Sequence, residues 1–186
     1  QTIFWRNSKL NFSNKVSLLK SLEEKPQKDW LRRINECQDE KVLKYFLKEA
    51  TNIEIQDNSE VLQILWECCQ IPDFVKKTYG HHFEVVSKIF KFLTSGDNKV
   101  PNHYMKEQLS LLDKLDGNVD SLSNRIANVR TWAYVSNKSN WVENQDYWIE
   151  RAKNLEDKLS DRLHEELTKT FIDKRASVLA RGLKQD

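Results

Sequence analysis

The sequence predicts an all-α protein, an irregular bundle of about seven or eight helices that ends in a long helix or a broken helix pair. Apolar residues recur at helical spacing over most of the chain. Only 4 Gly and 3 Pro occur among 186 residues, which argues against a β fold with many turns. We find no strong strand signal beyond a possible strand at residues 2–5.

The first half of the chain contains four helical patterns, each with start or stop signals. Ser13 is a plausible N-cap for the first helix, and Pro26 follows its end. Pro72 stops the third helix, and Gly96 stops the fourth. The expected helices span residues 14–24, 38–50, 59–71 and 81–95. The pattern of residues 28–34 is ambiguous.

The second half is expected to hold longer helices. Pro101 suits the first turn of a helix over 101–115, and Asp116-Gly117 is a turn signal. A narrow apolar seam then follows, formed by Val119, Leu122, Ile126, Val129 and Ala133. From about 144 to 180 the pattern is helical without Gly or Pro, and its apolar stripe drifts around the axis. This helix therefore either wraps across several neighbours or breaks near 168–173.

Composition limits the possible compartments and partners. A net charge of +2 is too small to predict nucleic-acid binding from the overall field. The odd cysteine count, with Cys37 alone and Cys68 next to Cys69, is a poor disulfide framework, so we expect reduced thiols and a cytoplasmic location. No stretch approaches the ~20 apolar residues of a membrane span, and no signal peptide opens the chain.

The chain begins with Gln1, and residues 2–5 are apolar. Trimming of a disordered tail is one explanation for this start. Excision from a longer protein is the explanation that we favour, because a natural terminus seldom starts inside a hydrophobic segment.

Signatures of catalysis are missing from the sequence. The glycines are isolated, so the sequence contains no glycine-rich phosphate-binding motif. We therefore expect no ATP hydrolysis by this chain alone. His164-Glu165 resembles the start of a zinc-protease motif, but Thr168 stands where the second histidine ligand would be. No catalytic residue, cofactor or metal site is predicted.

Cations and aromatic rings interleave between residues 125 and 141. On a helix, Arg125 and Trp132 share a face, and Arg130 and Tyr134 are i, i+4 neighbours. Single-stranded RNA is bound by such groups, because rings stack on bases and cations meet phosphates. These four residues and Trp141 are therefore candidates for nucleic-acid binding. The alternative is that Trp132 belongs to the core and that Arg130 packs along it or pairs with a carboxylate.

Lys174 and Arg175 near the C-terminus are further candidates for nucleic-acid binding. The alternative is that they serve helix-end electrostatics, because cations suit the negative end of the helix dipole.

Short stretches over nearly the whole chain resemble one family of proteins. They are residues 5–12 (WRNSKLNF), 65–74 (LWECCQIPDF), 116–117 with Asp120, 125–127 (RIA), 130–135 (RTWAYV), Trp141, 149–151 (IER), 156–161 (EDKLSD), 163–165 (LHE) and 171–175 (FIDKR). The sequence is similar to the C-terminal helical region of bacterial relatives of the mitochondrial degradosome RNA helicase. That family, the suppressor-of-Var family, is a DExH-type family of helicase superfamily two.

The resemblance implies a role after two RecA-like lobes that bind ATP and Mg²⁺. Residues 1–12 would be an extended lead-in from the preceding lobe, and residues 13–186 would be a helical C-terminal domain. The region would complete the single-stranded RNA channel, or dock a partner such as an exoribonuclease, without being an enzyme itself. The alternative function is a free-standing helical module that binds protein and no RNA.

Overall fold

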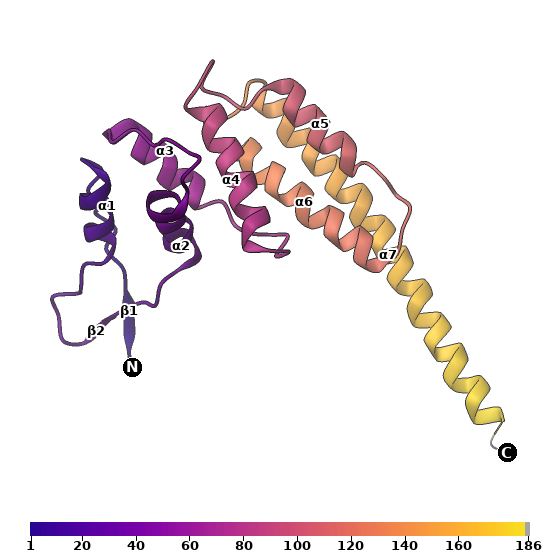
Figure 1. Cartoon of the computed structure of the whole chain (residues 1–186). Helices are drawn as coiled ribbons and strands as arrows, with labels where there is room; N and C mark the ends of the chain where they lie inside the picture. The colour runs from indigo at the N-terminus through magenta and orange to yellow at the C-terminus, as the bar shows by residue number, and fades with distance from the viewer. Residues whose placement is uncertain (185–186) are drawn as a thin grey trace. The chain divides into compact units, whose positions relative to one another are not determined.

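The computed structural model describes residues 1–184, and Figure 1 shows their helices and strands. The chain divides into two compact units. Unit 1 contains residues 1–72 and 77–98, and unit 2 contains residues 73–76 and the chain from Lys99 onward. The predicted all-α class is confirmed, because 62% of the chain is helical and the two strands are short. The expected boundary at residue 12 stays a prediction.

Unit 1 is built from four α-helices and one wide helical turn. They are α1 (Lys15–Leu22), α2 (Gln38–Lys44), the π-helical turn η1 (Tyr45–Glu49), α3 (Ser59–Cys69) and α4 (Tyr79–Leu93). Asn14 caps α1 by accepting a hydrogen bond from the Ser17 amide. The expected cap, Ser13, donates its hydroxyl to the Asn11 side chain instead. The helix expected over 38–50 is present, but its second half widens into η1.

The core of unit 1 comes from the apolar stripes of these helices. Its fully buried members include Leu18, Val42, Leu43, Leu62, Leu65, Val86 and Ile89. The half-buried rings of Tyr45 and Phe83 stack on each other, 4.0 Å apart and nearly parallel. Cys68 and Cys69 are buried here, and burial raises the pKa of the Cys69 thiol well above its usual value. Cys37, Cys68 and Cys69, all within the described residues, form no disulfide, in agreement with the sequence analysis.

A small parallel sheet accompanies these helices. Strand β1 (Ile3–Trp5) pairs in register with β2 (Leu31–Arg33), so that Phe4 lies opposite Arg32. The Ile34 amide donates to the Trp5 carbonyl at 2.9 Å and extends the ladder by one bond. The possible strand at 2–5 is therefore present as β1, and the ambiguous segment 28–34 supplies its partner.

Unit 2 is a three-helix arrangement of α5 (Asn102–Leu112), α6 (Val119–Asn137) and α7 (Gln145–Leu183). The predicted seam of α6 packs largely as expected, because Leu122, Ile126 and Val129 are buried. The matching face of α7 is formed by Trp148, Ala152, Leu155 and Leu159. Arg125 and the left-handed Gly117, with φ of 118°, shape the turn between α5 and α6.

Helix α7 is continuous over 39 residues (Figure 1). The predicted long C-terminal helix is therefore present, and its alternative, a break near 168–173, does not occur. Its buried residues end at Leu159, and every described residue from Leu167 onward is exposed. The drift of the apolar stripe does not make α7 wrap across several neighbouring helices, because the second half of α7 packs against neither α5 nor α6 (Figure 1). Over the residues that the structure describes, no helix has both the length and the apolar character that crossing a bilayer requires.

Candidate nucleic-acid interface

The predicted RNA-binding residues have very different environments in the structure. Trp132 on α6 is only 4% exposed and packs edge-on against Tyr104, with ring centroids 5.6 Å apart. Trp141, in the loop before α7, is also 4% exposed. Neither ring offers the open face that base stacking requires. The alternative interpretation of Trp132 as a core residue is therefore confirmed, and of the three rings considered only Tyr134 is not buried.

Arg125 has a structural role in the turn between α5 and α6. Its guanidinium donates hydrogen bonds to the carbonyl of Lys114, at 2.7 Å, and to the carbonyl of Asp116. A side chain at Gly117 would bring its Cβ within 3.2 Å of the Arg125 guanidinium and 3.0 Å of the Ser121 Cβ. This close approach explains why glycine suits position 117. The two hydrogen bonds to carbonyl groups hold the Arg125 side chain against the backbone of the turn.

Arg130 and Tyr134 of α6, together with Lys138, which caps the C-terminal end of this helix, form a row that we call the α6 row. They are spaced four residues apart, so they follow one face of α6 to its end. The Arg130 side chain is 54% exposed, and its Nε donates to Glu156 of α7 at 3.1 Å. The Lys138 ammonium lies 5.9 Å from the centre of the Tyr134 ring and 5.5 Å from that of Trp141.

The α6 row contains two of the five residues predicted in segment 125–141, Arg130 and Tyr134, and adds Lys138. Lys138 was not among the predicted residues, although it stands four residues after Tyr134. Arg130 adopts the carboxylate pairing that the alternative interpretation expected, but the pair is at the surface. A surface pair contributes ~0–1 kcal/mol, so it holds Arg130 only weakly.

The two C-terminal candidates, Lys174 and Arg175, are exposed on the outer half of α7. The Arg175 guanidinium lies 5.8 Å from the centre of the Phe171 ring. Neither cation forms an ion pair with any residue in the described part of the chain. Both are therefore accessible to an external anion.

Asp113, at the end of α5, links that helix to α7. It accepts a hydrogen bond from Lys158 at 2.8 Å and one from Arg151 at 3.2 Å. The Lys158 contact, with Arg151 in support, lowers the pKa of the Asp113 carboxyl below its ordinary value. Because its folded pKa is depressed, Asp113 stabilises the fold above about pH 4, and the contribution is lost as pH falls through the folded pKa.

Replacing Asp113 by asparagine is expected to reduce stability by about 1 kcal/mol near neutral pH, because the two pairs are partly exposed. The difference from wild type should shrink towards zero as pH falls well below 4. Urea denaturation across this pH range measures it. Asp157→Asn is the control, since Asp157 is exposed and makes no ion pair in residues 1–184. A pH-independent difference would contradict the assignment.

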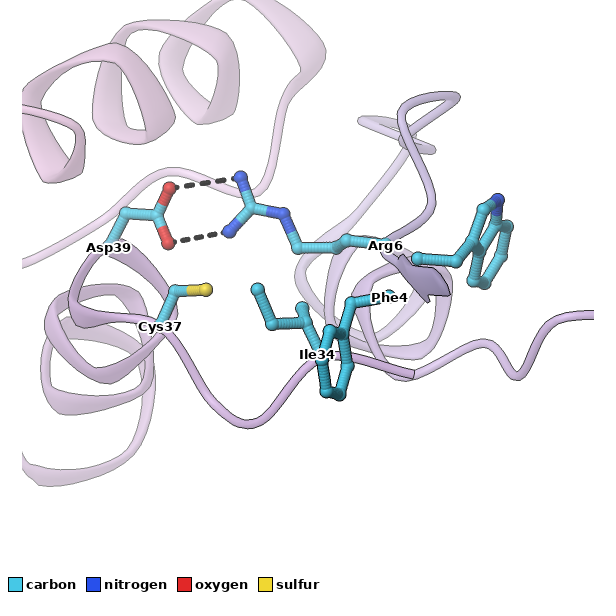
Figure 2. Close-up of a pocket in the computed structure, with 6 residues that line it drawn as sticks. Phe4, Arg6, Ile34, Cys37 and Asp39 are labelled. Carbon is cyan, nitrogen blue, oxygen red and sulfur yellow. Dashed lines mark hydrogen bonds and ion pairs between the residues drawn. The ribbon is translucent and has the colours of Figure 1, made fainter. Parts of the chain in front are cut away.

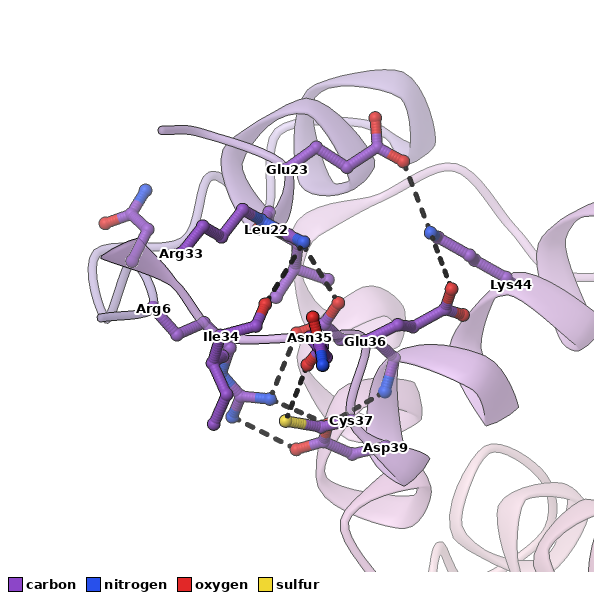
Figure 3. A network of polar contacts seen from close by, with 12 residues as sticks. Arg6, Leu22, Glu23, Arg33, Ile34, Asn35, Glu36, Cys37, Asp39 and Lys44 are labelled. Carbon is purple, nitrogen blue, oxygen red and sulfur yellow. Dashed lines mark hydrogen bonds and ion pairs between the residues drawn. The ribbon is translucent and has the colours of Figure 1, made fainter. Parts of the chain in front are cut away.

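Unit 1 contains a denser network of ion pairs that includes Arg6, Arg33 and Asp39 (Figure 3). The Glu40 side chain is 1% exposed and lies 3.1 Å from Arg33 Nη2 and 3.4 Å from Arg6 Nη1. Arg6 also holds Asp39 through two hydrogen bonds, of 2.7 and 3.1 Å. The bond to Asp39 raises the pKa of the Arg6 guanidinium, which stays charged.

A pocket of about 340 Å³ lies beside this network (Figure 2). Phe4 and Ile34 form its apolar wall, while Arg6, Asp39 and Cys37 form its polar side. Ligand atoms of Cys37, Asp39 and Glu40 lie within 4.8 Å of one another, which is close enough to hold a metal ion. The two arginines already neutralise both carboxylates, so a metal ion would have to displace them.

No family model, curated protein or solved structure matches this chain. The assignment of function therefore depends on the residues and contacts described above.

Proposed function

We propose that the chain is an accessory helical region of an ATP-dependent RNA helicase and that it contacts single-stranded RNA. The observation that carries this proposal is the α6 row, in which a ring lies between two cations along one helix face. The resemblance to the degradosome helicase family supports it. ATP and Mg²⁺ would be bound by RecA-like lobes of the parent polypeptide, and this chain would be non-catalytic.

The α6 row suits a strand of RNA because its groups differ in kind along its length. Arg130 and Lys138 supply positive charge for two phosphates, and the half-buried Tyr134 ring between them supplies a surface for a base or ribose. Binding would replace the contact between Arg130 and Glu156 by a contact to phosphate. Because that contact is exposed, the exchange costs little.

Arg130→Ala is expected to weaken the binding of single-stranded RNA and to lower the salt slope of log affinity by about 0.7, the value for one phosphate contact. Its unfolding free energy should change by less than about 1 kcal/mol, because the pair with Glu156 is exposed. Fluorescence anisotropy over a salt series, together with urea denaturation, gives both quantities.

Two further variants sharpen this test. Glu156→Gln removes the competing carboxylate and should tighten RNA binding. Arg162→Ala is the matched control, because Arg162 also pairs with glutamate, at 3.0 Å from Glu166, but lies outside the candidate set. A large loss of stability in Arg130→Ala with an unchanged salt slope would refute the role of Arg130.

Protein docking is a second candidate function, favoured by the outer half of α7. Six apolar side chains are exposed there: Leu167, Phe171, Ile172, Val178, Leu179 and Leu183. A patch of this kind is typical of a surface that another protein covers, and an exoribonuclease is one such partner. Absence of any salt-dependent affinity for RNA, with or without the RecA-like lobes, would favour docking over RNA binding.

A further inference from the structure

We propose that the small sheet of unit 1 carries a second surface for single-stranded RNA, which we call the sheet platform. It consists of Phe4, Trp30, Arg32 and Ile34, with Lys28 at its margin. The inference rests on the proposed RNA-binding function but uses a different unit of the chain. None of these residues was among the candidates from sequence.

The strand register places the platform residues together. Phe4 and Arg32 are partners across β1 and β2, so their side chains project from the same face of the sheet. Ile34 follows Arg32 by two residues and lines the pocket together with Phe4 (Figure 2). Trp30 stands in the turn immediately before β2.

The two rings of the platform are open to solvent. Phe4 is 64% exposed and Trp30 is 57% exposed, whereas Trp66, Trp132, Trp141 and Trp148 are all buried. The Lys28 ammonium lies 5.4 Å from the centre of the Trp30 ring. A base that stacks on Trp30 can take the place of this ammonium, which then becomes available to the adjacent phosphate.

The charge around the platform favours a polyanion. Residues 25–34 contain four basic residues and one acidic residue, Asp29, so this segment carries a net +3 against +2 for the whole chain. Lys25, Lys28 and Arg32 are exposed and form no ion pair with any described residue. Arg33 is the exception, because buried Glu40 neutralises it.

Of the neighbouring carboxylates, Glu23 pairs with Lys44 at 3.4 Å. Glu24 accepts a hydrogen bond from the neutral Asn7 amide at 2.8 Å and keeps its charge, so the favourable charge belongs to the segment 25–34 itself.

These features favour RNA over an apolar polypeptide as the occupant. An apolar partner would bury Arg32 and Lys28 without a counter-charge, which is costly. RNA supplies flat bases for Phe4 and Trp30 and phosphates for the cations. The pocket between Phe4, Ile34 and the Arg6–Asp39 pair gives an unstacked base an apolar wall beside hydrogen-bonding groups.

The test uses the full 186-residue chain and a short fluorescent oligouridylate. Phe4→Ala and Trp30→Ala should each weaken binding by at least about fivefold, the lower limit for loss of one stacked base. Trp30→Phe keeps a ring and should stay within about twofold of wild type. Arg32→Ala should lower the salt slope by about 0.7. RNA should also quench a tryptophan signal that is missing in Trp30→Phe.

Tyr147→Ala is the matched control, because Tyr147 is 58% exposed but lies on α7. If Phe4→Ala and Trp30→Ala bind RNA like wild type while Arg130→Ala does not, the platform is refuted and the α6 row stands. The reverse pattern refutes the α6 row alone. If the wild-type chain binds no RNA at low salt, both fail. Concentration-dependent self-association that Phe4→Ala abolishes would assign the platform to a second copy of the chain and overturn the inference.

Discussion

Replacing Trp132 by alanine is expected to lower the free energy of unfolding of unit 2 by about 4 kcal/mol, a typical cost for removing a buried aromatic side chain. The ring is 4% exposed and packs against Tyr104 of α5. Val129 and Val135, three residues to either side of it on α6, are fully buried, so removal of the ring leaves a cavity beside apolar side chains. Urea denaturation followed by circular dichroism measures the loss.

Trp30→Ala is the control for this experiment, because it removes the same side chain from an exposed position. Its unfolding free energy should stay within about 0.5 kcal/mol of wild type. Trp132→Ala should therefore lose stability, whereas Trp30→Ala should keep its stability and lose RNA affinity. If Trp132→Ala kept wild-type stability and lost RNA binding, the assignment of Trp132 to the core would be wrong.

The substitution Glu40→Gln is expected to destabilise unit 1 by about 3 kcal/mol. The carboxylate is buried between Arg6 and Arg33. The neutral amide would leave Arg33 without a counter-charge, while Arg6 would keep only Asp39. The amide can still accept through its one oxygen, but its NH2 group would face the N–H donors of the other arginine, so at least one hydrogen bond is lost.

The matched control for this variant is Glu36→Gln. Glu36 lies four residues earlier and pairs with Lys44 at 3.6 Å, but its side chain is 39% exposed. A change of about 0.5 kcal/mol or less is expected there, since exposed pairs contribute little. Equal losses in the two variants would show that burial of Glu40 does not govern the energetics.

Much of the helical framework was predictable from sequence because it depends on local patterns. Apolar stripes predicted most of the α-helices, Pro101 and the turn at Asp116-Gly117 indicated α5, and Pro72 and Gly96 marked the ends of α3 and α4. Errors arose where two local signals compete. Asn14 and Ser13 can both cap α1, and the structure uses Asn14 because Ser13 bonds to Asn11. Strand β2 has no periodicity of its own and exists only by pairing with β1.

The candidate site was less predictable, because exposure depends on contacts distant in sequence. Trp132 stands three residues after Val129, so its position relative to the seam favoured burial. Whether the ring is buried depends on its packing against Tyr104, which lies on another helix. Arg125 is held by carbonyls nine and eleven residues earlier, which no helical pattern reveals. The platform residues escaped notice because the ambiguous segment 28–34 gave no face on which to place Trp30 or Arg32.

The continuity of α7 has a consequence for helix–coil energetics. Starting a helix is unfavourable because several residues must be ordered for the first hydrogen bond, whereas extending one adds a bond for each residue ordered. The half of α7 that ends at Leu159 is fixed by packing and therefore acts as a permanent nucleus. The outer half needs only propagation from it. Its apolar residues are thus displayed in helical register before any partner arrives, and a partner need not meet the cost of nucleation.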